Sequence, residues 1–256
     1  MLEGSAKGTS DDGVVECVGG PGRRIAVKRV MWLVGLTLIA AGCAASPPPM
    51  VRSLSLAAGM PASGAATGVD VALQEVLVAG REDRILLTRV SLKNRTPAQL
   101  AVGPAQVHLA DAGRRLLLRI SERWLPGYYD AKLRGLSPAP DREAIPPFPS
   151  AELTLGERAY AAPPVTAAQQ EVLVVEVAKL VEEAFVRPQR DAPGFILDKG
   201  SEVTLGVLLK EVTLAPGDGV TGYVYFYHPA GRPLSYPLHL VIAVEGATSA
   251  FVFQDR

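Results

Sequence analysis

The segment Leu214–Gln254, "LAPGDGVTGYVYFYHPAGRPLSYPLHLVIAVEGATSAFVFQ", decides the fold class. Its apolar residues alternate with a period of two, as they do in a β-strand with two distinct faces. Three such runs are separated by turns rich in Pro and Gly, a pattern that predicts an antiparallel β-sandwich. In the first run, Tyr223, Tyr225 and Tyr227 share one face, and Val224 and Phe226 lie on the other. One face of the second run consists of Leu238, Leu240, Ile242 and Val244, and Phe251 and Phe253 share a face in the third.

The same alternation occurs upstream, from about Asp70. Residues 84–93 are expected to form a strand whose even positions, from Leu86 to Leu92, face the core. The turn residues 94–97 follow, and then "AQVHLADAGRRLLLRI", in which the turn "DAGR" predicts a β-hairpin between Val107 and Ile120. The inward positions expected before residue 84 are Val71, Leu73, Val76 and Val78.

Two segments, Val69–Arg115 and Glu211–Gln254, together resemble the immunoglobulin-like, telokin-like domains of bacterial lipoproteins of unknown function. The shared pattern is a strand that leads into an Asn-x-Thr/Ser turn and "xVxLxDxxGxR", and later "LxPGxxxxGxVxF". These are turn and core positions, so the resemblance implies a fold and brings no catalytic residues. The matching residues are Asn94, Thr96, Val107, Leu109, Asp111, Gly113, Arg115, Leu214, Pro216, Gly217, Gly222, Val224 and Phe226.

Residues 121–200 do not follow the sandwich pattern, and we interpret them as a helical insertion. Apolar residues at helical spacing, led by Leu173 and Val177, predict a helix from about Ala167 to Val186. Thr166 and Gln169 match a capping box, and Pro188 is expected to end the helix. Residues 201–212, "SEVTLGVLLKEV", fit either helix or strand, and we slightly favour helix.

The N-terminal segment predicts export from the cytoplasm. A basic stretch precedes an apolar run that is too short to span a bilayer as a helix, and small residues follow, as in a secretory signal. The end of this run, "AAGC", resembles the lipobox of bacterial lipoproteins, in which the cysteine is acylated and becomes the first mature residue. We therefore expect residues 1–42, an upstream extension and signal peptide, to be removed between Gly42 and Cys43, with a fatty-acid (palmitate-type) lipid on Cys43. A plain secreted or membrane-tethered chain is the alternative.

Residues 43–68 are rich in Ala, Ser, Pro and Gly, which disfavours a packed core and predicts a flexible tether. The β-sandwich domain is then expected over residues 69–256, with the insertion at about 121–200. Ala44 replaces the aspartate that retains many lipoproteins at the inner membrane. By that resemblance we expect an outer-membrane lipoprotein that faces the periplasm or the cell surface.

Trp124, Tyr128 and Tyr129 surround a Pro-Gly pair in "RWLPGYYDAKL". Aromatic residues in an exposed loop favour partner binding, because they offer large contact areas at low entropic cost. The alternative, which we favour, is that they pack on the sandwich edge or on the helix. The histidines, His108, His228 and His239, lack the spacing of a zinc motif, and we expect neither a metal nor a cofactor.

The charges balance, with 26 Lys and Arg against 26 Asp and Glu, so nucleic-acid binding is not expected. No nucleophile elbow, phosphate loop or dinucleotide motif occurs in the sequence. The sequence therefore predicts a lipid-anchored, non-catalytic binding, adhesion or scaffolding module of the cell envelope. The alternatives are an envelope enzyme or metal-handling protein that uses the insertion, and a subunit of an envelope assembly.

Overall fold

The computed structural model describes residues 51–59, 61, 63–66, 68–79, 82–138, 141–148, 150–195 and 207–255. The expected signal peptide and Cys43 lie outside the described residues. The described chain is mainly β, and its strand ladders are antiparallel. The strands are β1 (Arg52–Ser53), β2 (Ser55–Leu56), β3 (Ser63–Ala66), β4 (Val69–Ala79), β5 (Ile85–Asn94), β6 (Leu100–Val102), β7 (Val107–Ala110), β8 (Leu118–Ile120), β9 (Glu152–Leu155), β10 (Arg158–Ala161), β11 (Val212–Leu214), β12 (Gly219–Tyr227), β13 (Leu238–Val244) and β14 (Ala247–Gln254).

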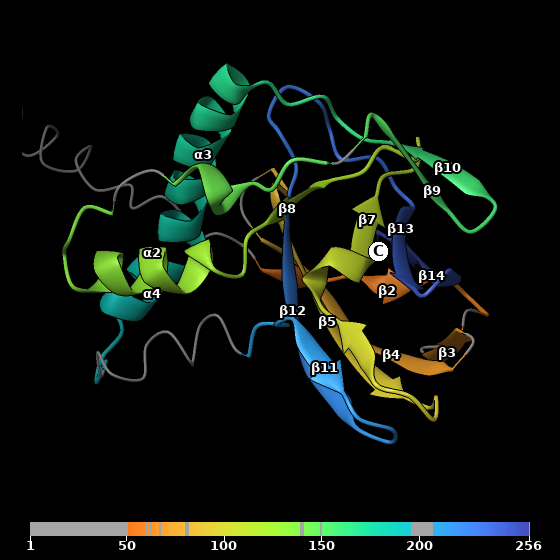
Figure 1. Ribbon diagram of the computed structural model, residues 1–256. Helices are drawn as coiled ribbons and strands as arrows, with labels where there is room; N and C mark the ends of the chain where they lie inside the picture. Colours follow the sequence, from red (N-terminus) through yellow and green to blue (C-terminus); the bar gives the residue numbers. More distant parts are fainter. Residues whose placement is uncertain are drawn as a thin grey trace, which may run out of the picture. The chain divides into compact units, whose positions relative to one another are not determined.

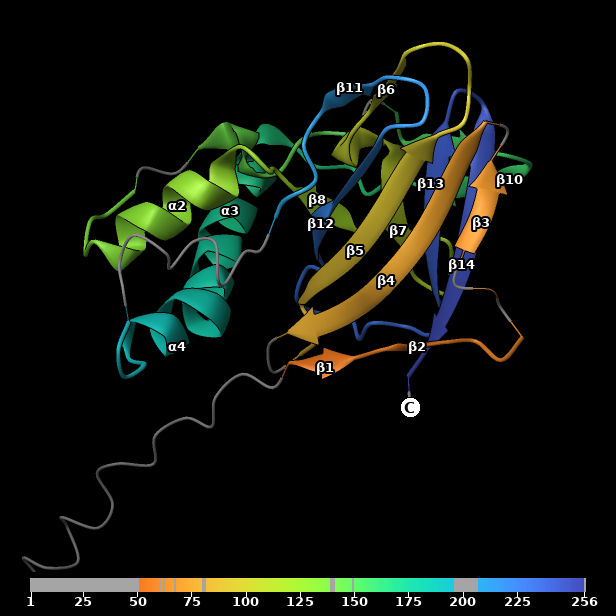
Figure 2. The ribbon, with the colours of Figure 1, turned by 90° about the horizontal axis from the view of Figure 1, so that it is seen from below.

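Two larger sheets face each other (Figures 1 and 2). The first has the order β1-β4-β5-β12-β8, with β3 also paired to β4, and the second has the order β2-β14-β13-β7. β9 pairs with β10, and β6 pairs with β11. The three C-terminal strands thus form as the alternation predicts, with β12 in one sheet and β13 and β14 in the other.

The core between the sheets contains the positions that the sequence pattern places inward. Leu86, Val90 and Leu92 on the even face of β5 are fully buried, and so is Thr88. In β4 the inward set changes from odd to even positions, because a bulge between Leu73 and Glu75 shifts the register. The expected inward sets of β4, β5, β13 and β14 are therefore confirmed.

One end of the first sheet is also buried on its other face, where helices cover it (Figure 2). Tyr225 and Tyr227 of β12 and Ile85 and Leu87 of β5 point to this side and form a second apolar cluster with the helices. The start of β5 and the end of β12 are thus apolar on both faces, whereas Arg89 and Lys93 further along β5 are exposed.

The described part of the segment predicted as a helical insertion contains three α-helices and the β9–β10 hairpin. The helices are α2 (Trp124–Leu133), α3 (Ala167–Val181) and α4 (Arg187–Arg190), and a π-helical turn (Glu182–Val186) joins the last two. The predicted capping box is confirmed: the Thr166 hydroxyl accepts from the Gln169 N–H, and the Gln169 side chain accepts from the Thr166 N–H.

The prediction that Pro188 ends this helix is wrong. The π turn shifts the hydrogen bonding by one residue, so that the Arg187 N–H donates to the Glu182 carbonyl. Pro188 then lies in the first turn of α4, where a backbone N–H needs no partner within the helix.

The predicted hairpin between Val107 and Ile120 forms its turn but not its ladder. Asp111 Oδ1 accepts from the Arg115 N–H at 2.9 Å, and Ala110 bridges Leu116. Beyond that bridge the strands separate: β7 pairs with β13, and β8 pairs with β12 of the other sheet. The local pattern located both strands correctly, but it could not indicate that the chain crosses from one sheet to the other.

The helix favoured for residues 201–212 is wrong over the part that the structure describes, from residue 207. Leu208 bridges Tyr223 of β12, and the Leu209 N–H donates to the Tyr223 carbonyl at 2.9 Å. Gly222 permits this approach, because a Cβ on Gly222 would lie 2.4 Å from the Leu209 nitrogen. Residues 201–206 lie outside the described residues.

The flexible tether predicted for residues 43–68 is also wrong over much of its described part. β1 and β3 pair with the outer edge of β4, and β2 pairs with β14. Leu54 is only 7% exposed, and its N–H donates to the Val76 carbonyl at 2.9 Å. The composition does not indicate this docking, because Ala, Ser, Gly and Pro predominate in the segment, and backbone ladders and a few larger side chains such as Leu54 hold it.

Candidate functional site

The outer face of α3 carries exposed apolar residues between charged ones. Val172 is 68% exposed and Val175 is 47% exposed, whereas Val174, Val177 and Val181 on the opposite face are buried. We call the exposed residues the α3 stripe, which consists of Glu171, Val172, Val175 and Lys179 in α3 and Glu183 in the π-helical turn that follows. Exposed aliphatic side chains on a helix that is packed on its other side favour an interaction surface.

Two surface hollows adjoin the α3 stripe. One, with a volume of about 610 Å³, runs along α3 beside Arg84 and reaches Leu180 and Glu183. The other, of about 460 Å³, lies at the start of α3 and is lined mainly by apolar side chains, among them Leu118, Pro164 and Val172. Val172 lines both hollows and Val175 lines the first, so the exposed valines belong to recesses that are open to a partner.

A polar cluster of Arg84, Glu176 and Tyr227 fixes α3 on the first sheet. The Arg84 guanidinium donates to the Tyr227 hydroxyl at 2.7 Å and also to Glu176, and the Tyr227 hydroxyl donates to the same carboxylate. Burial, and next the hydrogen bond to Glu176, raise the pKa of Tyr227, so the phenol stays protonated and able to donate. Side-chain hydrogen bonds therefore hold the helix that presents the α3 stripe.

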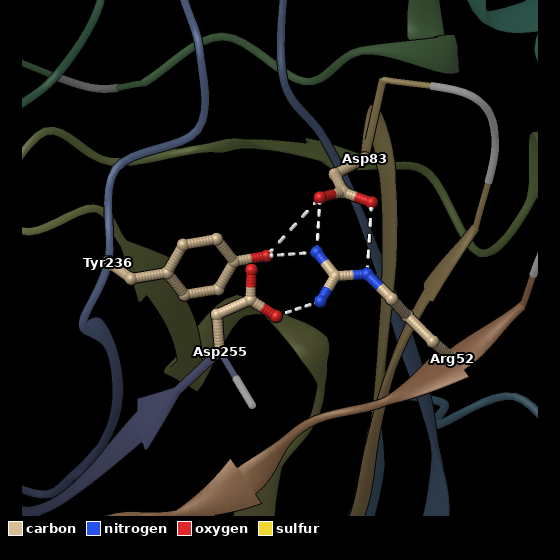
Figure 3. A network of polar contacts seen from close by, with 4 residues as sticks. All are labelled: Arg52, Asp83, Tyr236 and Asp255. Atoms are coloured by element: carbon tan, nitrogen blue, oxygen red, sulfur yellow. Dashed lines mark hydrogen bonds and ion pairs between the residues drawn. The ribbon is translucent and has the colours of Figure 1, made fainter.

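A second polar cluster, which we call the Arg52 cluster, consists of Arg52, Asp83, Tyr236 and Asp255 (Figure 3). Arg52 Nε donates to Asp83 Oδ1 at 3.3 Å, and Nη2 donates to the Tyr236 hydroxyl at 2.9 Å. Arg52 also forms ion pairs with Asp83 and Asp255. Burial, and next the charge of Asp83, raise the pKa of Tyr236 to about 12.

The four residues of the Arg52 cluster come from distant parts of the chain: β1, the β4–β5 connection, the loop before β13 and the residue after β14. Hydrogen bonds and ion pairs with the Asp83 and Asp255 carboxylates raise the pKa of Arg52 despite some desolvation, so its charge persists across the usual pH range. The cluster therefore fastens the first described strand to the C-terminal end of the domain. All its carboxylates face a cation that the chain itself supplies, which indicates a structural role.

The structure buries the three aromatic residues considered for partner binding. Trp124, Tyr128 and Tyr129 lie on α2, not in an exposed loop, and each is at most 6% exposed. Trp124 stacks on Tyr128 at 4.6 Å between ring centroids, and the Tyr128 hydroxyl donates to the Ala178 carbonyl of α3 at 3.0 Å. This packing leaves the three side chains little area for a partner. Their arrangement agrees with the alternative given above, in which they pack against the predicted helix.

The three histidines do not form a metal site in the described part of the chain. His108 lies on β7 and His239 on β13, where their cross-strand neighbours are Val241 and Ala110, and His228 follows β12. Burial lowers the pKa of all three, and that of His108 falls to about 4. In these same described ranges, no helix combines the length and the apolar character needed to cross a membrane.

Neither the exposed valines of α3, Val172 and Val175, nor the polar cluster around Arg52 was identified from the sequence. The apolar stripe of the predicted helix was centred correctly on Val177, but Val172 and Val175 fall beside it and were not identified as exposed. The sequence does contain an indication of this exposure, because the two valines lie three residues apart among charged residues on the polar face of the predicted helix. Arg52 had no comparable signal, since its partners lie 31 and 203 residues away in the chain.

Comparisons with known proteins add little. No family model and no curated protein matches the chain. One solved structure, the yjhA protein from Bacillus subtilis, aligns with a TM-score of 0.31 and 11% sequence identity, over 70% of this chain and 76% of that one. A likeness this weak supports no conclusion about fold or function.

Proposed function

We propose that the protein is a lipid-anchored, non-catalytic binding module of the cell envelope, held to the membrane through Cys43. The observation that carries the binding role is the α3 stripe: two exposed valines stand between recesses on a helix that side-chain hydrogen bonds hold in place. A rigid, partly apolar surface of this kind suits protein recognition better than catalysis.

The proposal of a lipid anchor is based on the sequence around Cys43. The Arg52 cluster shortens the length of chain that can separate this anchor from the folded domain. Eight residues separate Cys43 from Arg52, where the chain is fastened to the domain. Fully extended, the nine steps between those residues span about 30 Å. On this proposal the domain stays close to the bilayer, with the end that carries the Arg52 cluster nearest to it.

The immunoglobulin-like assignment belongs to the same proposal. It is supported by two facing antiparallel sheets and by the way in which the two resembling segments meet. Buried Asn94, in the Asn-x-Thr turn, donates to the Leu214 carbonyl at 3.1 Å, and Leu214 begins the later "LxPG" motif. The Asn94 carboxamide oxygen also accepts from the Thr96 N–H at 2.8 Å. A buried polar side chain at the end of β5 thus joins the two motifs.

The charges around the α3 stripe indicate the class of partner. Glu176 is paired with Arg84, and Glu171 with Arg142. Lys179 and Glu183, for which no ion pair occurs within the described ranges, carry opposite charges. The surface is therefore close to neutral, which favours a protein partner of mixed charge over a nucleic acid or an anionic membrane surface.

The test of the anchor is metabolic labelling of the full chain with a fatty-acid probe, together with fractionation of the cells. We expect the probe to label the wild-type protein in the membrane fraction. The Cys43→Ser variant should lose both the label and the membrane association, whereas Cys17→Ser should retain both. Labelling of Cys43→Ser, or wild-type protein in the cytosol, would refute the anchoring.

A further inference from the structure

We propose that the α3 stripe binds a second copy of the same chain, with the two α3 helices antiparallel across a two-fold axis at Val175. This deepens the proposed binding role and rests on it, because it names the partner of that surface. The contact between the two helices does not involve the lipid, although confinement to one membrane favours the dimer.

The arrangement of charges on α3 is self-complementary. Glu171 lies four residues before Val175 and Lys179 lies four residues after it, so both are on the helix face that carries Val175. In an antiparallel pair centred on Val175, Glu171 of each copy lies opposite Lys179 of the other. Two equivalent ion pairs then flank a Val175–Val175 contact, as the symmetry of an isologous interface requires.

The side chains that this arrangement needs are accessible. Val175 is 47% exposed, and Lys179 is exposed with no ion pair in the part of the chain that the structure describes. Glu171 contacts Arg142 at 3.3 Å, but their side chains are 63% and 79% exposed, so that pair is weak and easily exchanged. Val172, at 68% exposed, adds apolar area beside the aliphatic part of the opposing Lys179.

One helix pair lies at the small end of interface sizes, below about 1,200 Å² in total, so the dimer is weak in dilute solution. Two copies confined to one membrane meet at a higher effective concentration, which favours the dimer. The test therefore has to work on the full chain in its membrane and has to capture a weak complex.

Disulfide crosslinking of Val175→Cys in intact envelopes meets that requirement. The two-fold axis places the two introduced thiols opposite each other, so mild oxidation should give a crosslinked dimer of this chain. Leu136→Cys, at a residue that is 60% exposed but outside α3, is the matched control and should crosslink much less. Failure of Val175→Cys to exceed that control overturns the proposal, whether the chain is then found single or bound to another protein.

Charge exchange tests the register. Glu171→Lys or Lys179→Glu, added to Val175→Cys, places like charges opposite each other twice and should reduce dimer formation about tenfold. Both reversals in one chain, or co-expression of the two single-reversal chains, restore opposite charges and should restore crosslinking. No loss, or no restoration, would contradict the antiparallel pairing. Cys43-dependent labelling is measured separately, so the anchor can stand if the dimer fails.

Discussion

Replacement of Arg52 by alanine should release the N-terminal strands without unfolding the domain. Arg52 makes three side-chain contacts, with Asp83, Tyr236 and Asp255. The side chains of Arg52 and Asp83 are 31% and 29% exposed, so solvent weakens each contact to about 0.5–1 kcal/mol. The loss totals about 2 kcal/mol, which corresponds to an increase of about 30-fold in local opening.

Hydrogen exchange followed by mass spectrometry measures this opening. The amides of Leu54 and Ala57, which donate to the Val76 and Val252 carbonyls, should exchange about 30-fold faster in Arg52→Ala. Amides in β5 should be unaffected. Arg95→Ala is the matched control, since it removes an exposed Arg–Asp pair, with Asp70, that does not involve β1 or β2. Unchanged exchange at Leu54 and Ala57, or equal acceleration in β5, would refute the separate docking of this segment.

Three further substitutions, one of them with a matched control, test the fold. Gly222→Ala should cost about 1–3 kcal/mol of unfolding free energy in denaturant titrations, because its Cβ meets the Leu209 backbone at 2.4 Å; Gly127→Ala, in open space on α2, should be neutral or slightly stabilising. Asn94→Ala should cost about 1–3 kcal/mol, because the buried Leu214 carbonyl loses its side-chain donor. Burial lowers the pKa of His108 to about 4, so on acidification the unfolded chain binds the proton before the folded chain does. The free energy of unfolding should therefore fall as the pH decreases from about 6.5 to 4. His108→Gln should remove part of this pH dependence in acid titrations, and an unchanged dependence would contradict the burial of His108.

The strands of the core could be predicted because each carries its own alternation. β12, β13 and β14 follow that pattern residue by residue, and even the bulge in β4 leaves two short alternating runs, each with the correct inward residues. The capping box of α3 is equally local, since Thr166 and Gln169 are three residues apart.

The parts that failed depend on contacts between distant segments. The alternation of apolar residues within β7 and β8 does not indicate that these strands pair in different sheets. It also does not indicate that the chain around Leu208 lies against β12, where Gly222 leaves space for it. The N-terminal strands are too short to show a period, and their attachment comes from Leu54 and from partners of Arg52 near the other end of the chain. The exposure of Val175 likewise depends on how α3 is rotated on the sheet.

Mass analysis of the N-terminal peptide from protein purified out of cell envelopes tests the anchoring most directly. The proposal predicts a mature chain that begins at Cys43 and carries a diacylglyceryl group on its sulfur. A chain that begins upstream of Cys43, or one in which the Cys43 thiol is unmodified, would contradict it.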